Sequence, residues 1–292
     1  GLEIRALQKE YRECLKRIAE YEKILKSRDG MNKVIKEDLD HIKEEFAVPR
    51  KTLIENGKEA VYEESAAAVA EVVFVMDRFG YCKLLDRTVY ERNRETVDNE
   101  YKYVIPCLNT DKLCIFTDTG NLHQVKMMDI PSGKLRDKGT PIDNLSKYDG
   151  SKEEIVFLTN FGRLTGQLLL FATKMAMVKQ VPAEEFVTNN RTVAATKLQD
   201  GDSLLTVRIA GTETDLVLQS ASGMFLRFSM DEIPELKKNS RGVRGMKLGT
   251  GDELEEIYFV TQQPQIVYKE KEVHLNRLKL AKRDGKGSKV RL

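Results

Sequence analysis

A segment of sequence recurs along most of the chain, and this internal repeat constrains the fold more than any other feature. Four copies align on a turn residue (Gly80, Gly120, Ala176 or Gly223), at intervals of 40, 56 and 47 residues. Apolar residues lie seven and five positions before each turn residue and two and five positions after it, and a weaker fifth copy surrounds Pro264. Two apolar strands joined by a polar turn are typical of a β-hairpin, so each copy predicts one.

Repeats of this length that each contain a hairpin are typical of blades arranged around an axis. One hairpin cannot bury its apolar faces alone, so neighbouring blades must supply the hydrophobic core. The predicted fold is therefore mainly β: a propeller-like wheel of about five blades over residues 71–292.

The N-terminal region has a different pattern. Apolar residues at positions 7, 11, 14, 18, 21 and 25 alternate in steps of four and three, which is a heptad seam. A second amphipathic pattern runs from Ile35 to Phe46, after a turn signal at Asp29-Gly30. These patterns predict a helical hairpin at the end of a coiled coil over residues 1–48, followed by a linker over residues 49–70.

The composition disfavours several classes of function. The 292 residues include 48 basic and 46 acidic side chains, a net charge of +2, so overall charge would attract nucleic acid only weakly. The four cysteines lack zinc-site spacing, and no catalytic triad or phosphate-binding loop is recognisable. We therefore expect no catalytic residue, no metal site and no cofactor in this chain. The sequence also lacks a recognisable secretory signal or membrane span, which favours a cytoplasmic protein.

Basic residues recur in the predicted hairpins and in the segments that follow them. In a wheel, equivalent positions share one rim, and a row of cations there matches a bent phosphate backbone without reading bases. The sharpest local signal is Ser240-Arg241-Gly242-Val243-Arg244-Gly245, in which glycines permit close approach to a phosphate. The candidate DNA-binding residues are Lys83, Arg87, Arg92, Arg94, Lys126, Lys134, Arg136, Lys138, Lys174, Lys179, Arg227, Lys237, Lys238, Arg241, Arg244 and Lys247.

Other interpretations of these cations remain open. A third of the chain is charged, so the same residues could form solvated faces, and the Arg-Gly segment could be a simple connector. The weak basic balance favours a protein-interaction propeller on a coiled-coil tether. The tail segment Gly285-Lys286-Gly287-Ser288-Lys289 lacks the spacing of a phosphate-binding loop, and we expect it to be a basic flexible tail.

Several motifs resemble one known family over nearly the whole chain. They are Phe116-Thr117-Asp118-Thr119-Gly120 with Lys138-Gly139-Thr140-Pro141-Ile142, Phe171-Ala172-Thr173-Lys174 with Val178-Lys179, and Gly223-Met224-Phe225-Leu226-Arg227-Phe228 with Arg241-Gly242-Val243-Arg244-Gly245-Met246-Lys247-Leu248. The chain resembles the C-terminal part of the A subunit of a bacterial type IIA topoisomerase, meaning DNA gyrase or topoisomerase IV.

This resemblance implies a β-pinwheel whose rim binds and bends double-stranded DNA with little sequence specificity, preceded by an arm of the coiled-coil gate. It also implies a full-length ATP-dependent isomerase whose partners are an ATPase B subunit and a second A subunit, with no membrane partner. The catalytic tyrosine and the ATP and magnesium sites would lie outside these residues. The protein would work in the bacterial cytoplasm, associated with the nucleoid.

One segment departs from the family pattern. Gyrase A subunits carry an Arg/Gly-rich box after the opening hairpin of the first blade, and here the matching residues are Glu91-Arg92-Asn93-Arg94-Glu95-Thr96-Val97. The carboxylates oppose phosphate binding, and no glycine permits a close approach. The resemblance therefore favours topoisomerase IV, whose boxes are degenerate, over a gyrase A subunit that has lost its box.

Overall fold

A computed structural model describes residues 2–52 and 68–290 of the chain. The chain divides into two units, Gly1–Glu64 and Ser65–Leu292. Most of the predicted linker, residues 53–67, lies outside the described residues. No helix in the described ranges combines the length and apolar character that crossing a lipid bilayer requires.

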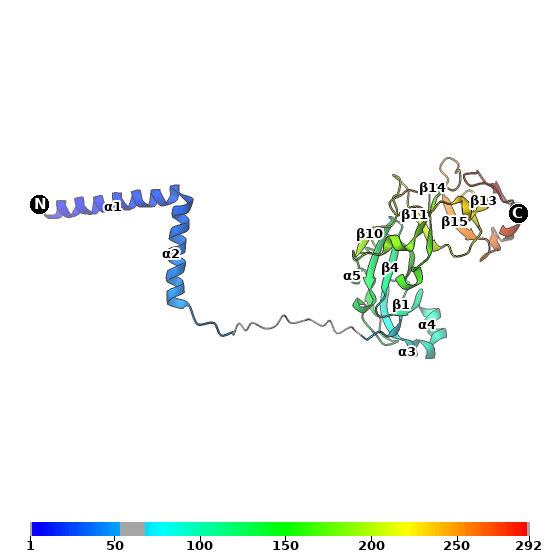
Figure 1. Cartoon of the computed structure of the whole chain (residues 1–292), viewed down its shortest axis with the longest axis horizontal. Coiled ribbons are helices and arrows are strands. Elements are labelled where there is room, and N and C mark those ends of the chain that lie inside the picture. The colour runs from blue at the N-terminus through cyan, green and yellow to red at the C-terminus, as the bar shows by residue number, and fades with distance from the viewer. Residues whose placement is uncertain (1, 53–67, 291–292) are drawn as a thin grey trace. The chain divides into compact units, whose positions relative to one another are not determined.

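The first unit contains two helices, α1 (Leu2–Lys26) and α2 (Arg28–Phe46). The break lies at Ser27 and not at the predicted Asp29-Gly30, because the Ser27 hydroxyl caps α2 and accepts the Gly30 N–H at 3.1 Å. The helices diverge from this point and do not lie side by side as the predicted hairpin would (Figure 1). Their apolar seam is exposed: Leu7 and Tyr11 retain 71% and 65% of their accessible surface.

The second unit contains four four-stranded antiparallel sheets, which we call blades, and one two-stranded hairpin (Figure 1). Blade 1 has the strand order β3-β1-β2-β6, with β1 (Glu71–Met76), β2 (Tyr81–Asp86), β3 (Tyr103–Leu108) and β6 (Thr140–Pro141). Blade 2 has the order β7-β4-β5-β10, with β4 (Lys112–Thr117), β5 (Asn121–Lys126), β7 (Ile155–Asn160) and β10 (Thr192–Ala194).

The later blades repeat the arrangement. Blade 3 has the order β11-β8-β9-β14, with β8 (Leu168–Thr173), β9 (Met177–Pro182), β11 (Leu204–Ile209) and β14 (Val243–Arg244). Blade 4 has the order β15-β12-β13-β18, with β12 (Asp215–Ser220), β13 (Met224–Ser229), β15 (Leu254–Phe259) and β18 (Ser288–Lys289). The fifth repeat forms the hairpin of β16 (Gln265–Tyr268) and β17 (Lys271–His274).

Short helices connect the strands. They are α3 (Arg87–Arg92), α4 (Arg94–Glu100), α5 (Ile142–Leu145), α6 (Phe161–Leu164), and the 3₁₀ turns η1 (Met127–Asp129), η2 (Ala183–Phe186), η3 (Met230–Glu232) and η4 (Leu275–Arg277).

Consecutive blades exchange strands. The central hairpin of each blade is completed on one edge by a later strand of the same repeat, and on the other edge by a short strand from the following repeat. We call β6, β10, β14 and β18 the exchanged strands. Because each is covalently part of the next repeat, no blade is complete without its successor, as expected of repeats that share a core.

The hydrophobic core lies between blades and follows the two-residue period of the strands. Leu113 and Ile115 of β4 pack in the cluster shared with blade 1, whereas Cys114 and Phe116 pack in the cluster shared with blade 3. All four residues are fully buried. The predicted mainly β, bladed fold is thus confirmed.

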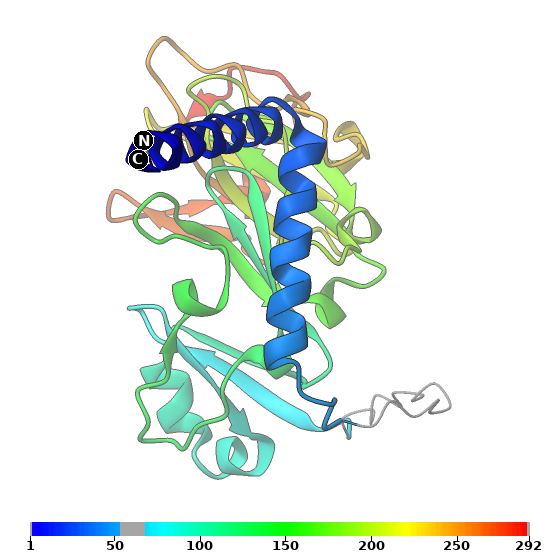
Figure 2. The same ribbon diagram turned by 90° about the vertical axis from the view of Figure 1, so that its left-hand side faces the viewer.

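The first blade has a cover of its own. Tyr90 of α3 and Val97 of α4 pack on Val73, Val75 and Leu85, so these two helices close the face of blade 1 that points away from blade 2. In Figure 2 blade 1 and its helices (cyan and teal) lie at one end of this unit, and the strands of the last repeats (orange and red) lie toward the other end. The described blades therefore form an open arc.

Candidate nucleic-acid interface

Three loops that lead into exchanged strands share one length and one geometry. Residues 132–139, 235–242 and 280–287 precede β6, β14 and β18, and we call them the basic loops. The first residue of each forms a parallel bridge to the central hairpin, in the pairs Leu84 with Ser132, Gln180 with Glu235 and Arg227 with Leu280. The last residue of each is a glycine with positive φ: Gly139 at 85°, Gly242 at 89° and Gly287 at 73°.

These glycines are required by backbone contact. A Cβ atom at Gly139, Gly242 or Gly287 would lie 2.5, 2.6 or 2.7 Å from a carbonyl oxygen of the neighbouring strand. Only glycine both fits this space and adopts this φ without strain. The geometry therefore brings each exchanged strand close to its blade directly after a basic residue.

Replacement of Gly242 by alanine should separate β14 from β9. We expect the free energy of unfolding to fall by about 1–3 kcal/mol, from the positive φ and the contact with the Val178 carbonyl. Chemical denaturation of the wild type and the variant measures this loss. Gly249→Ala is the matched control, because Gly249 has negative φ and a Cβ atom there would meet nothing within 4 Å. A loss of similar size in the control would contradict the proposed role of Gly242.

The basic loops concentrate the positive charge of the chain. Each contains three basic residues and one acidic residue, a net charge of +2 over eight positions. The three loops together carry +6, which leaves −4 for the other 268 residues, because the whole chain carries +2. The net charge of +2 for the whole chain is therefore the sum of strongly basic loops beside the exchanged strands and a weakly acidic remainder.

Two positions in each loop hold an exposed cation. They form the pattern Lys-x-x-x-Lys/Arg-Gly, with Lys134 and Lys138, Lys237 and Arg241, and Lys282 and Lys286. Within the described part of the chain, none of these six side chains forms a salt bridge. The Lys138 ammonium lies 4.1 Å from the centre of the Tyr81 ring. Exposed cations of this kind can bind phosphate oxygens, a contact that positions a duplex without reading its sequence.

Blade 2 departs from this pattern. The segment before β10 is shorter, and by register Arg191 takes the place of Lys138, because Val193 pairs with Leu122 as Thr140 pairs with Cys82. The shorter segment borders a cavity of about 410 Å³ whose lining includes Lys112, Lys126 and Arg191. Blade 2 thus also carries cations beside its exchanged strand, but the segment that bears them is shorter than a basic loop.

The predicted site residues divide by position. Lys134, Arg136, Lys138, Lys237 and Arg241 are exposed in basic loops, and Lys238 is half-buried there. Arg92, Arg94, Lys126, Lys174, Arg244 and Lys247 are exposed outside these loops. Arg244 donates two hydrogen bonds to Asp284, which holds the pKa of that carboxyl below its usual range. The side chains of the remaining four predicted residues form hydrogen bonds or ion pairs within the protein.

The prediction that Lys83 and Lys179 face DNA is wrong. Both side chains are buried, and each ammonium group donates three hydrogen bonds to backbone carbonyls. Arg227 is half-buried, pairs with Asp215 and donates to the carbonyls of Asn276 and Leu278. Arg87 is half-buried and pairs with Glu91 at 2.8 Å. Lys83 and Lys179 are buried because a loop from another repeat packs over each of them, which counting basic residues cannot reveal.

Three cations of this series are absent from the predicted set. Lys282, Lys286 and Arg191 belong to the series, and the segment predicted as a flexible tail contains β18, paired with β13 through Phe225 and Ser288. The available signal was the pattern Lys-x-x-x-Lys/Arg-Gly, which occurs at residues 134–139, 237–242 and 282–287.

In the first repeat, helices α3 and α4 occupy the sequence position that a basic loop and exchanged strand take in the second, fourth and fifth repeats. Residues 87–100 contain four acidic residues and no glycine. The Arg94 guanidinium lies over the Tyr90 ring at 5.6 Å and donates to its hydroxyl at 3.3 Å. The segment departs from an Arg/Gly-rich loop in conformation as well as in charge.

Comparison with known proteins supports this description. Residues 167–210 and 214–261, which contain most of the third and fourth repeats, match the family model described as "DNA gyrase C-terminal domain, beta-propeller". The chain is 30% identical over 263 residues to the A subunit of DNA gyrase from Chlamydia muridarum, covering 85% of this chain and 32% of that protein. The chain therefore spans about a third of the length of this relative.

Solved structures show the same fold. The C-terminal domain of a DNA topoisomerase IV aligns with a TM-score of 0.68 and 21% identity, over 76% of this chain and 72% of that chain. A DNA gyrase A C-terminal domain aligns with a TM-score of 0.52 and 20% identity, over 74% and 76%. The bladed unit is thus a β-pinwheel of the kind found in C-terminal domains of type IIA topoisomerase A subunits.

Proposed function

We propose that this chain, which carries the C-terminal β-pinwheel of a type IIA topoisomerase A subunit, binds and bends double-stranded DNA along the edge formed by its exchanged strands. The observation that carries the proposal is the threefold recurrence of a basic loop of one length and net charge +2, beside blades 1, 3 and 4. Cations repeated along an arc match phosphates along a curved duplex. No base-reading helix accompanies them in the described blades, so sequence preference should be slight.

The contacts must offset the cost of bending. Bending a duplex of 20–30 bp costs about 1–6 kcal/mol, so several blades must act together before DNA follows the arc. With at least six phosphate contacts, affinity should fall on the order of a thousandfold between about 50 and 200 mM salt. Binding is therefore expected to be strongly salt-dependent.

The first blade favours a topoisomerase IV-like module over a gyrase-like one. In place of an Arg/Gly-rich box, the free face of blade 1 is covered by the two short helices α3 and α4, which bear four acidic residues against three arginines. A continuous chiral wrap would need a basic contact surface there, which these carboxylates oppose. A gyrase A subunit that has lost its box is the alternative.

In this proposal the full-length protein is an ATP-dependent isomerase of the bacterial cytoplasm that acts on the nucleoid. Its partners are an ATPase B subunit and a second A subunit, and the catalytic tyrosine and the ATP and magnesium sites lie outside this chain. The chain presents a bent duplex to the strand-passage machinery, and α1 and α2 belong to the arm of the gate.

A ligation assay tests the proposal. Nicked plasmid is sealed with increasing amounts of the chain at low salt and then deproteinised, and its linking number is read on a gel. We expect salt-sensitive binding with no one-signed change in linking number, because the arc bends DNA without wrapping it. A progressive one-signed shift would support the gyrase alternative. Absence of binding at low salt would contradict DNA binding and favour a protein-interaction propeller.

A further inference from the structure

Two buried lysines hold the first two basic loops in the same way. Lys83 of β2 and Lys179 of β9 occupy equivalent positions, three residues after the turns at Gly80 and Ala176, and each is 1% exposed. The Lys83 ammonium donates to the carbonyls of residues 134, 135 and 137 at 2.8, 2.9 and 2.5 Å. The Lys179 ammonium donates to those of residues 237, 238 and 240 at 3.4, 2.8 and 2.7 Å.

The six carbonyls occupy identical positions in the two loops. Counted from the first residue of each loop, they belong to the third, fourth and sixth residues. Each ammonium group therefore turns three carbonyls of its loop inward, around one point. All three ammonium hydrogens are used, so neither lysine has a donor left for a phosphate.

The exposed cations flank the carbonyls that are held. Lys237 itself supplies one of the three carbonyls around Lys179, and Arg241 directly follows Ser240, which supplies another. The same relation joins Lys134 and Lys138 to Lys83. Because the backbone of the loop is held at these carbonyls, the Cα atoms of its two exposed cations are held in place as well.

We propose that Lys83 and Lys179 are positioning residues for DNA binding, which hold the basic loops in the shape that presents their exposed cations to phosphates. This inference rests on the function proposed above. A loop ordered before binding loses less conformational entropy when it binds, so the lysines should raise affinity without touching DNA.

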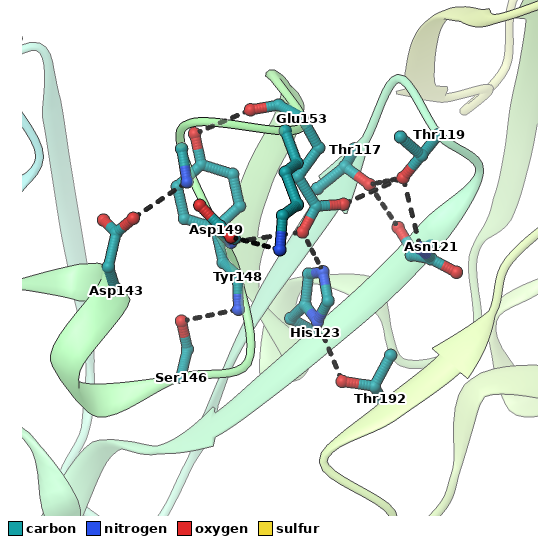
Figure 3. A network of polar contacts seen from close by, with 12 residues as sticks. Thr117, Thr119, Asn121, His123, Asp143, Ser146, Tyr148, Asp149, Glu153 and Thr192 are labelled. Atoms are coloured by element: carbon teal, nitrogen blue, oxygen red, sulfur yellow. Dashed lines mark hydrogen bonds and ion pairs between the residues drawn. The ribbon is translucent and has the colours of Figure 1, made fainter.

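The other blades show that the fold does not require a lysine here. In blade 2 the equivalent residue is His123, which contacts Thr192 Oγ1 at 2.8 Å and Glu153 Oε1 at 2.6 Å, and the segment before β10 is not a basic loop (Figure 3). In blade 4 the equivalent residue is Leu226, and Arg283 instead donates to the carbonyls of Glu232 and Arg244. A blade can thus be completed with a histidine or a leucine in this place.

The surroundings of Lys179 lower the pKa of its ammonium group, so its charge depends on pH in the mildly alkaline range. The charged side chains on the elements around it are Glu185 of η2, the four charged residues of the loop, Arg244 of β14, and Lys197 after β10, whose N–H approaches the Ser240 carbonyl. The charged residues of the loop are Glu235, Lys237, Lys238 and Arg241. The Phe171 ring lies 5.3 Å from the ammonium. Burial lowers the pKa of Lys179 to about 8, and the charge of Glu185 opposes this shift.

The first test removes the ammonium group. Lys179→Met in the whole chain is compared with wild type and with Lys152→Met, which removes one exposed cation outside the basic loops. Binding to a 40-bp duplex is measured by fluorescence anisotropy, and folding by thermal unfolding. We expect affinity to fall about tenfold for Lys179→Met, the cost of ordering one loop and two long side chains upon binding, and less than about twofold for the control.

The second test uses pH and does not depend on the folding of the methionine variant. Between about pH 8 and 10 the unfolded chain binds a proton at Lys179 that the folded chain lacks, so this residue makes the folded state more stable as pH rises. DNA affinity should fall over the same range, because the neutral amine has lost one donor and its charge. Lys179→Arg keeps its charge, so its affinity should fall less than that of wild type.

The outcomes separate this inference from the proposed function. Equal affinities for Lys179→Met and Lys152→Met, or identical pH profiles for wild type and Lys179→Arg, would overturn the positioning role while leaving DNA binding intact. If wild type itself shows no salt-sensitive binding, the proposed function fails first. If Lys179→Met does not fold, the pH comparison decides.

Discussion

Replacing the six shared cations of the basic loops by glutamine should reduce DNA affinity at least a thousandfold at about 50 mM salt and lower the salt slope by roughly five, because each phosphate contact contributes about 0.9 to that slope. The variant carries Gln at positions 134, 138, 237, 241, 282 and 286. The loss should be uniform across duplex sequences, since these side chains bind phosphates and not base edges.

The control for this prediction removes the same charge elsewhere. Six exposed cations outside the loops are replaced by glutamine: Lys102, Lys147, Lys152, Arg163, Lys269 and Lys271. Anisotropy titrations at four salt concentrations give the affinity and the slope for wild type and both variants. An equal loss in the control variant would mean that net charge, and not the exchanged-strand edge, governs binding.

Replacing Phe116 by alanine should destabilise the pinwheel by about 3–5 kcal/mol, since it opens a cavity in the core between blades 2 and 3. Phe116 is fully buried, and its ring contacts Phe157, Phe171 and Phe186 at centroid distances of 5.8, 6.0 and 5.5 Å. Chemical denaturation measures the change in the free energy of unfolding. Exchanged strands join these blades to their neighbours, so the loss should appear in the main unfolding transition.

The matched control is Phe79→Ala in the turn of the first hairpin. Phe79 is 72% exposed, so its removal should change the free energy of unfolding by less than about 0.5 kcal/mol. If Phe116→Ala lost no more stability than this control, the core between blades 2 and 3 would not be the main source of stability in this part of the protein.

The arc and its first blade bear on how such a module would handle DNA. Each exchanged strand makes one blade depend on the next, so the basic loops keep a regular order along the arc. Helices α3 and α4, with four acidic and three basic residues, occupy the free face of blade 1. If the proposed function is correct, the exposed cations of the basic loops and the four carboxylates at the first blade should together favour a bend of limited length over a continuous wrap.

Much of the pinwheel could be predicted from sequence, because the information is local. A hairpin requires apolar residues two positions apart on either side of a turn, and four turn residues with this pattern reveal four blades. Helices α1 and α2 follow from heptad spacing in the same way, whereas their break at Ser27 depends on a capping bond that the stronger Gly30 signal hid.

The exchanged strands could not be predicted from the sequence, because each pairs with a strand far away along the chain. Strands β6, β14 and β18 have two residues each, too few for any periodic signal, and Ser288 pairs with Phe225 more than sixty residues earlier. The same long-range pairing separates the basic residues into two classes. Local pattern determined that this chain builds blades and bears cations beside them. Only the tertiary structure decided that Lys138 and Arg241 face solvent while Lys83 and Lys179 are buried beneath the same loops, because burial depends on the segment that another repeat supplies.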